Sequence, residues 1–229
     1  MALAEGWNGS SWSVNATPNP SGAQASSLVA VSCTSGTACT AAGYYANKTG
    51  VDLPLAEAWN GTSWAIQTTP ALIGAEQASL QGVSCTTGTA CTAVGSVESG
   101  GAPILVERWN GTSWTIQRTP NPTGRAIVLQ GVSCTSGTAC TAVGHYTNSA
   151  GVQVTLAEIW NGSSWAIQST PNPSGAKNPV LNAVSCTSST AWTAAGDYTI
   201  SAGVRVPLAE VWDGSGWSIQ STPAPTGRA

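Results

Sequence analysis

Five pairs of tryptophans recur along the chain at a nearly constant spacing. The first members of successive pairs lie 52, 50, 51 and 52 residues apart. The pairs are Trp7 and Trp12, Trp59 and Trp64, Trp109 and Trp114, Trp160 and Trp165, and Trp212 and Trp217. Cysteines follow the same period in the first three full repeats. A period near 50 residues made of short strands is typical of a β-propeller, in which each repeat forms one blade.

Each repeat reads as two β-hairpins, of which the first contains the tryptophans. It runs L-A-E-x-W, then an N-G-x-S turn, then W-x-I-Q, and Asn-Gly supplies the positive φ angles of a tight turn. Pairing Trp59 with Trp64 places Glu57 opposite Ile66. One face of the hairpin is then bulky (Leu, Glu, Trp, Ile), and the other is nearly flat (Ala, Gln). We expect the bulky face of one blade to pack on the flat face of its neighbour, which favours a propeller over a sandwich.

The second hairpin of each repeat contains the cysteines, as L-Q-G-V-S-C, a T-T-G-T-A turn and C-T-A-V-G. This arrangement lets the two cysteines lie opposite each other, where Cα atoms ~4.5 Å apart are within disulfide reach. Small residues such as Ala93 and Gly95 suit a crowded ring centre. We predict the disulfides Cys33–Cys39, Cys85–Cys91 and Cys134–Cys140 rather than reduced thiols.

The fourth repeat departs from this pattern, because Trp192 takes the position of the partner that Cys186 lacks. We expect Trp192 to fill the space of the missing bridge and to leave a buried thiol, with pairing between molecules as the alternative. Structural zinc uses closer cysteine pairs or histidines, and the chain has one histidine. We therefore predict neither a metal nor a cofactor.

Composition excludes several classes of protein. Only 7% of residues are charged, 41% are hydrophobic, and the net charge is -3. These values are not those of a disordered chain, and they provide no basic surface for nucleic acid. No apolar run is long enough to span a membrane as a helix, so we expect no membrane insertion. What remains is an all-β protein.

The cysteines also bear on the compartment. Seven cysteines in a low-charge chain rich in Ser and Thr indicate an oxidising environment. We therefore expect an extracellular or cell-surface location. The first residues, M-A-L-A-E-G-W, lack the basic region and apolar core of a signal peptide. We interpret the chain as an excised piece of a longer, exported protein.

The repeats predict one β-propeller domain over residues 1–229 with four-stranded blades of about 51 residues. The Cys hairpin is taken as inner and the Trp hairpin as outer. The four full blades lie at about 24–68, 77–118, 127–169 and 179–221. Residues 2–17 form an extra outer hairpin without an inner one, which gives a five-bladed-like arrangement. The open edge of this incomplete blade predicts a homo-oligomer.

Two known groups of propellers have similar repeats. V-S-C-x-x-x-x-A-W-T-A-A-G at 184–196, followed by E-V-W-D-G-S-G-W at 210–217, resembles the repeats of Asp-box and photosystem-assembly-factor-like propellers. The W-N-G-S-S-W and W-D-G-S-G-W turns are similar to those of bacterial and fungal fucose-binding lectin propellers. The full Asp-box is absent, and the lectins' Arg and Glu sugar ligands do not map onto this chain residue by residue. The resemblance implies a secreted binding propeller rather than an enzyme.

A glutamate recurs two residues before the first tryptophan of each pair. These residues are Glu5, Glu57, Glu107, Glu158 and Glu210. Paired carboxylates catalyse glycoside hydrolysis, but a residue present in every blade on the stacked face is expected to serve packing. His145, the single histidine, has no identifiable nucleophile and orienting acid beside it in sequence. We therefore predict no catalytic residue and no enzyme.

The variable stretch after each V-G contains our candidates for recognition. They are Tyr45, Asn47, His145, Tyr146, Asn148, Asp197 and Tyr198. Tyr and Asn offer flat contact area and adaptable hydrogen bonds, whereas ordinary loop polarity is the alternative. We expect most tryptophans to pack inside the protein.

These residues predict a non-catalytic, lectin-like propeller that binds a glycan at several equivalent sites acting by multivalency. The alternative is a structural or protein-interaction propeller, which includes an engineered or excised repeat fragment that self-assembles.

Overall fold

The computed structural model describes residues 1–72, 74, 77–98 and 104–223. Across these residues it contains β-strands and no helix. The strands form four four-stranded antiparallel sheets and one two-stranded sheet, each with its strands in chain order. This confirms the predicted all-β fold with four complete repeats and an additional N-terminal hairpin, and it is consistent with a propeller-like protein.

We name the sheets by their order in the chain. The two-stranded sheet is hairpin β1–β2, with β1 (Ala4–Trp7) and β2 (Trp12–Asn15). Sheet I comprises β3 (Ala25–Ser35), β4 (Ala38–Ala46), β5 (Asp52–Trp59) and β6 (Trp64–Gln67). Sheet II comprises β7 (Gln77–Thr87), β8 (Ala90–Glu98), β9 (Ile104–Trp109) and β10 (Trp114–Ile116). Sheet III comprises β11 (Gly124–Ser136), β12 (Ala139–Asn148), β13 (Gln153–Trp160) and β14 (Trp165–Gln168). Sheet IV comprises β15 (Lys177–Ser188), β16 (Ala191–Thr199), β17 (Arg205–Trp212) and β18 (Trp217–Gln220).

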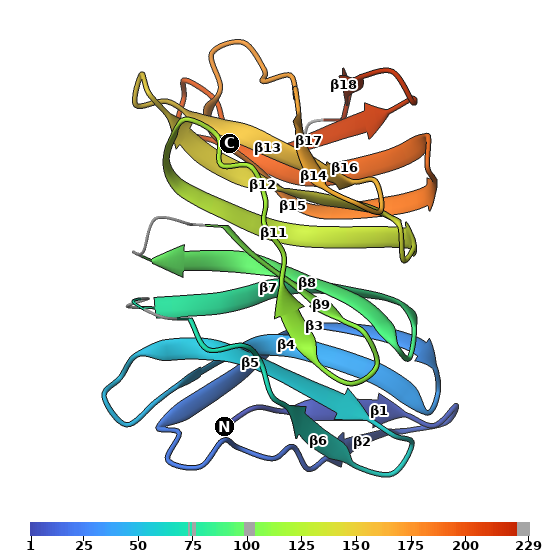
Figure 1. Ribbon diagram of the computed structural model, residues 1–229. Coiled ribbons are helices and arrows are strands. Elements are labelled where there is room, and N and C mark those ends of the chain that lie inside the picture. Colours follow the sequence, from blue (N-terminus) through green and yellow to red (C-terminus); the bar gives the residue numbers. More distant parts are fainter. Residues whose placement is uncertain (73, 75–76, 99–103, 224–229) are drawn as a thin grey trace. The chain divides into compact units, whose positions relative to one another are not determined.

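The chain divides into two compact units, Met1–Gln117 and Arg118–Ala229. The first contains hairpin β1–β2 and sheets I and II, which are layered in chain order (Figure 1). The second contains sheets III and IV, also layered face to face (Figure 1). A single propeller domain over residues 1–229 remains a prediction.

The Trp hairpins have the predicted register. Trp59 pairs with Trp64, and Glu57 pairs with Ile66. The intervening turn is held by Asn60, whose side-chain oxygen accepts the backbone N–H of Thr62 at 2.9 Å. The next residue, Gly61, has a φ of 96°, which L-residues rarely adopt. The Asn-Gly sequence therefore fixes both the turn and the pairing of the strands that it joins.

The Cys hairpins also have the predicted register, with each pair of cysteines directly opposite in the ladder. The three predicted disulfides are present, with Cα–Cα distances of 3.9 Å for Cys33–Cys39 and 4.0 Å for each of the others. In sheet IV the same register places Trp192 opposite Cys186, which is a free thiol. The indole of Trp192 stacks on that of Trp212 with ring centroids 5.1 Å apart.

Neighbouring sheets pack flat face against bulky face in both units. In the first unit, Ala42 and Ala56 of sheet I share a buried cluster with Leu105 and Trp114 of sheet II. In the second unit, Val143 and Ala157 of sheet III share a cluster with Leu208 and Trp217 of sheet IV.

We call the contact between sheets I and II, and that between sheets III and IV, a joint. The two joints contain an equivalent polar contact. The backbone N–H of Cys85 donates to the Ser32 hydroxyl at 2.9 Å, and that of Cys186 donates to Ser133 at 3.1 Å. The predicted alternation of small and large faces is therefore present between sheets I and II and between sheets III and IV.

Candidate functional site

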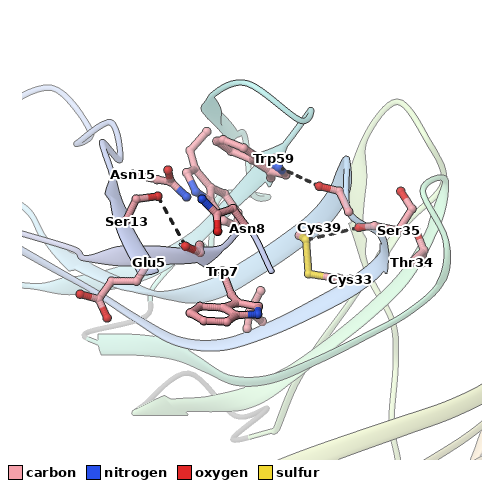
Figure 2. Close-up of a pocket in the computed structure, with 14 residues that line it drawn as sticks. Glu5, Trp7, Asn8, Ser13, Asn15, Cys33, Thr34, Ser35, Cys39 and Trp59 are labelled. Carbon is pink, nitrogen blue, oxygen red and sulfur yellow. Dashed lines mark hydrogen bonds between the residues drawn. A yellow bond between two sulfur atoms is a disulfide. The ribbon is translucent and has the colours of Figure 1, made fainter. Parts of the chain in front are cut away.

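A cleft of about 600 Å³ lies in the first unit, between hairpin β1–β2 and the Cys hairpin of sheet I (Figure 2). Its lining includes the indoles of Trp7, Trp59 and Trp64 and the Cys33–Cys39 disulfide. Asn8, Ser13 and Asn15 of hairpin β1–β2 also line it. The cleft therefore combines aromatic surface with neutral hydrogen-bonding groups.

The position of the cleft follows from the repeat. In the first unit, sheet I covers the bulky face of sheet II, and Val83 on that face is 8% exposed. Val31 occupies the same place in sheet I and is 61% exposed. Strand β1 pairs with β2 alone, whereas its counterpart β5 lies between β4 and β6. The cleft therefore lies where the other repeats place an inner Cys hairpin.

The polar groups at the cleft differ in how much hydrogen-bonding capacity they retain. The side-chain oxygen of Asn8 accepts the backbone N–H groups of Ser10 and Ser11, each at 2.9 Å. It therefore holds the turn of hairpin β1–β2. Ser13 is exposed, and its hydroxyl donates to the backbone carbonyl of Gly6 at 3.5 Å (Figure 2). Its oxygen retains acceptor capacity, and the half-buried amide of Asn15 adds a donor and an acceptor at the cleft.

The indoles are held at fixed positions around this space. Trp59 donates its Nε1–H to the backbone carbonyl of Gly36 at 3.3 Å (Figure 2). Trp7 pairs with Trp12 across the hairpin, with ring centroids 5.7 Å apart, and it is 53% exposed. We expected the tryptophan pairs to be mainly internal, and Trp7 and Trp12 differ from this because the bulky face of their hairpin is uncovered.

The predicted recognition residues lie elsewhere. Tyr45 belongs to β4, whereas His145, Tyr146 and Asn148 belong to β12, and Asp197 and Tyr198 belong to β16. We expected a variable loop here, but strand pairing continues, because each segment pairs with the following strand. Only Asn47 lies in the turn beyond its strand. None of the seven lines the cleft.

Three of these seven side chains form contacts within their own sheet. The side-chain oxygen of Asn47 accepts the backbone N–H of Thr49 at 2.9 Å, and that of Asn148 accepts the backbone N–H of Val152 at 3.0 Å. Asp197 accepts three hydrogen bonds from Arg205, the shortest at 2.6 Å. These contacts stabilise turns and strand ends. A role of the seven residues in ligand binding stays a prediction.

His145 is partly buried, and burial lowers its pKa below the usual value. Its flanking strand residues are Val128 and Thr155, which provide no acid to orient an imidazole. Among the described residues, the buried Nδ1 of His145 has no hydrogen-bond partner, whereas a general base is normally oriented by one.

The repeated glutamates divide into two groups. Four of them are fully buried: Glu57, Glu107, Glu158 and Glu210. Burial raises the pKa of Glu107 and Glu158 to about 8 and that of Glu57 and Glu210 to about 7, with nearby Thr155 opposing the effect at Glu210. Glu5 alone is exposed, and it is the single charged residue lining the cleft. The cleft therefore does not contain the pair of carboxylates that glycoside hydrolysis uses.

Two further features of the described residues are negative. They contain no group of three or more His, Cys, Asp and Glu side chains arranged to hold a metal. They also include no helix with the length and apolarity needed to cross a bilayer.

The cleft was not predicted from the sequence. Trp7 was interpreted only as a member of the repeated tryptophan pairs, and Asn15 and Val31 were not singled out. The available signal was the extra hairpin at residues 2–17, which lacks an inner partner. It predicted an open edge without indicating that the uncovered surface would form a cavity.

No family model and no curated protein sequence matches the chain. Among solved structures, the chain is similar to "YCF48 bound to D1 peptide", with a TM-score of 0.51 and 12% identity. The match covers 89% of this chain, which spans 55% of that structure's length. It is also similar to "Structure of SapL1 lectin in complex with alpha methyl fucoside", with a TM-score of 0.50 and 13% identity over 95% of this chain and 71% of that one.

A third similar structure, described as "Glycoside hydrolase", has a TM-score of 0.45 and 9% identity over 92% of this chain and 77% of that one. The first two similarities confirm the resemblance of this fold to assembly-factor and lectin propellers.

Proposed function

We propose that this protein is a non-catalytic recognition module, outside the cell or on its surface, that binds neutral carbohydrate in the cleft beside hairpin β1–β2. The observation that carries the proposal is the arrangement of Trp7, Trp59 and Trp64 around a 600 Å³ space. Three disulfides in a chain of this size support the oxidising compartment.

The lining matches the chemistry of a sugar. A pyranose ring has an apolar C–H face that packs on an indole, and its hydroxyls need donors and acceptors at the rim. Asn15 and Ser13 provide both, and the Glu5 carboxylate accepts hydroxyl protons. Ligand sites typically occupy about 300–1,000 Å³, so the cleft has room for a mono- or disaccharide. The similar lectin fold, solved with a fucoside, supports this ligand class.

The test is a titration of the full chain in solution with monovalent sugars chosen from a glycan array. Trp7→Ala is expected to weaken binding at least tenfold, because it removes one stacking surface. Trp12→Ala is the matched control, since it breaks the same Trp7–Trp12 pair but does not line the cleft. We expect it to change affinity less than twofold.

The number of sugars bound per chain distinguishes binding in the cleft from binding at the predicted strand-end residues. One sugar per chain supports the cleft. About four sites per chain, unaffected by Trp7→Ala, would instead favour the repeated positions near Tyr45 and Tyr146. Silence across the array would contradict carbohydrate binding.

A second candidate function is protein recognition, and it rests on the edge of β1. This strand pairs on one side only, so an extended peptide could add to it, as in other cases of strand addition. The similar structure solved with a bound peptide supports this class. Saturable binding of extended peptides, with no response to sugars, would favour this function.

A further inference from the structure

We propose that copies of this chain associate head to tail. The bulky face of hairpin β1–β2 in one copy packs on the flat face of sheet IV in the next. The residues that carry this association, Leu3 and Trp12 of the hairpin and Ala195 and Ala209 of sheet IV, do not line the carbohydrate cleft. Each half of the contact has a counterpart inside the described units.

The first half of the contact is the bulky face of hairpin β1–β2, which is exposed although the equivalent face of sheet II is buried. Leu3 and Trp12 are 64% and 66% exposed. Their counterparts in sheet II, Leu105 and Trp114, are 1% and 4% exposed under sheet I. The first hairpin thus presents to solvent the side chains that form the joint between sheets I and II.

The same difference holds in the second unit. There the counterparts of Leu3 and Trp12 are Leu208 and Trp217, at 2% and 8% exposure, packed with sheet III. In both joints a flat face covers these two positions. No sheet of the first unit places a flat face over Leu3 and Trp12 of hairpin β1–β2.

The second half is an exposed flat face. Ala195 and Ala209 of sheet IV are exposed and half-exposed, respectively. Their counterparts in sheet I, Ala42 and Ala56, are fully buried in the joint with sheet II. Sheet IV therefore carries the small residues that accept a Leu-Trp face, with no sheet of the second unit on that side.

A polar pair adds specificity to the match. In the first unit, the Trp114 indole N–H donates to the side-chain oxygen of Gln67 at 2.9 Å across the joint. The corresponding positions are Trp12 on the hairpin and Gln220 at the outer strand of sheet IV, and Gln220 is exposed. The proposed contact therefore pairs the Trp12 indole of one copy with the Gln220 amide of another.

A second copy is the occupant that these surfaces specify, because one chain carries both complementary halves. Two identical bulky faces would not interdigitate, so the contact joins unlike faces. Such a heterologous contact leaves one free face at each end of a pair, and it propagates into longer chains of copies unless a ring closes.

The experiment is sedimentation velocity over a wide range of protein concentration. The wild type is expected to shift from monomer to species larger than a dimer. Trp12→Arg blocks the hairpin face and Ala209→Arg blocks the sheet face, so each variant alone is expected to sediment as a monomer. Thr62→Arg, in the exposed turn between β5 and β6, is the control and should behave as the wild type.

Mixing the two blocked variants provides the decisive arm. Each retains the half that the other lacks, so the mixture is expected to form a 1:1 dimer and nothing larger. This result also shows that neither substitution has unfolded its chain. A wild type that stays monomeric at high concentration would overturn the proposal, as would a mixture that stays monomeric. Because neither residue lines the cleft, sugar binding that survives in both variants leaves the proposed function standing whichever way this test falls.

Discussion

At the residue scale, four of the five repeated glutamates are fully buried, and their protonation state is the part that the sequence left open. Glu107 lies fully buried in the joint between sheets I and II. Desolvation disfavours its charged form and raises its pKa from 4.5 to about 8. Glu5 occupies the same place in the repeat and is exposed. Equivalent glutamates thus differ in burial, because a neighbouring sheet covers Glu107 and none covers Glu5.

This difference predicts a pH-dependent stability. Between pH 4.5 and about 8 folded Glu107 retains its proton and the unfolded chain releases it, so the free energy of unfolding falls as pH rises. Each such group contributes up to about 1.4 kcal/mol per pH unit. Glu107→Gln is expected to match the wild type near pH 5 and to be more stable by on the order of 2–4 kcal/mol at pH 8–9. Urea unfolding at the two pH values measures this, with Glu5→Gln as the unchanged control. A Glu107→Gln chain that is less stable than the wild type at pH 8–9 would refute the assignment.

The Cys186 and Trp192 pair yields a second prediction at this scale. Because the two lie directly opposite each other, Trp192→Cys is expected to form a fourth disulfide and reduce the free-thiol count from one to zero. The variant loses the stacked Trp192 ring, which costs about 3–5 kcal/mol, and the short bridge returns about 2 kcal/mol. We therefore expect a net loss of about 1–3 kcal/mol. Thr193→Cys, opposite Ser185 on the other face, should leave two free thiols. Two thiols in Trp192→Cys would contradict the register.

At the scale of the element, the hairpins were predictable because their signals are local. An Asn-Gly turn fixes the pairing of the strands beside it, and the register of Glu57 with Ile66 followed directly. The strand ends were less predictable. Polar residues such as His145 and Asp197 have the composition of a loop, yet the adjacent strand pairs with them. Backbone pairing with a neighbouring strand outweighed local propensity there.

The glycine of the V-G motif illustrates how a local element depends on its partner. A Cβ on Gly95 would lie 1.9 Å from the backbone oxygen of Ser79 on the adjacent strand. Gly95→Ala is therefore expected to destabilise the protein by about 3 kcal/mol or more, since the backbone must move. Gly88→Ala, where a Cβ meets nothing within 4 Å, should stay within about 0.5 kcal/mol of the wild type. Thermal melts of the two variants compare them directly, and equal melting temperatures would contradict the close approach.

At the scale of the whole molecule, each of the two units is held together by the same packing of a flat face on a bulky face. The cleft and the exposed Trp12 both occur where a bulky face has no sheet covering it. The predicted alternation of bulky and flat faces accounts for the buried Leu105 and Trp114. The cleft could not be predicted in the same way. It exists because no inner Cys hairpin covers Val31, and no residue type in the sequence signals that absence. The uncovered Trp12 has the same origin.

Oxidative footprinting of the tryptophans, read by mass spectrometry on dilute protein, tests this account most directly. The joints protect Trp114 and Trp217, which are 4% and 8% exposed. Trp7 and Trp12, at 53% and 66%, lie on the uncovered face. We predict that Trp7 and Trp12 are modified at least several-fold faster than Trp114 and Trp217. Equal rates for all four would contradict the joint of bulky and flat faces on which the cleft and the proposed association both depend.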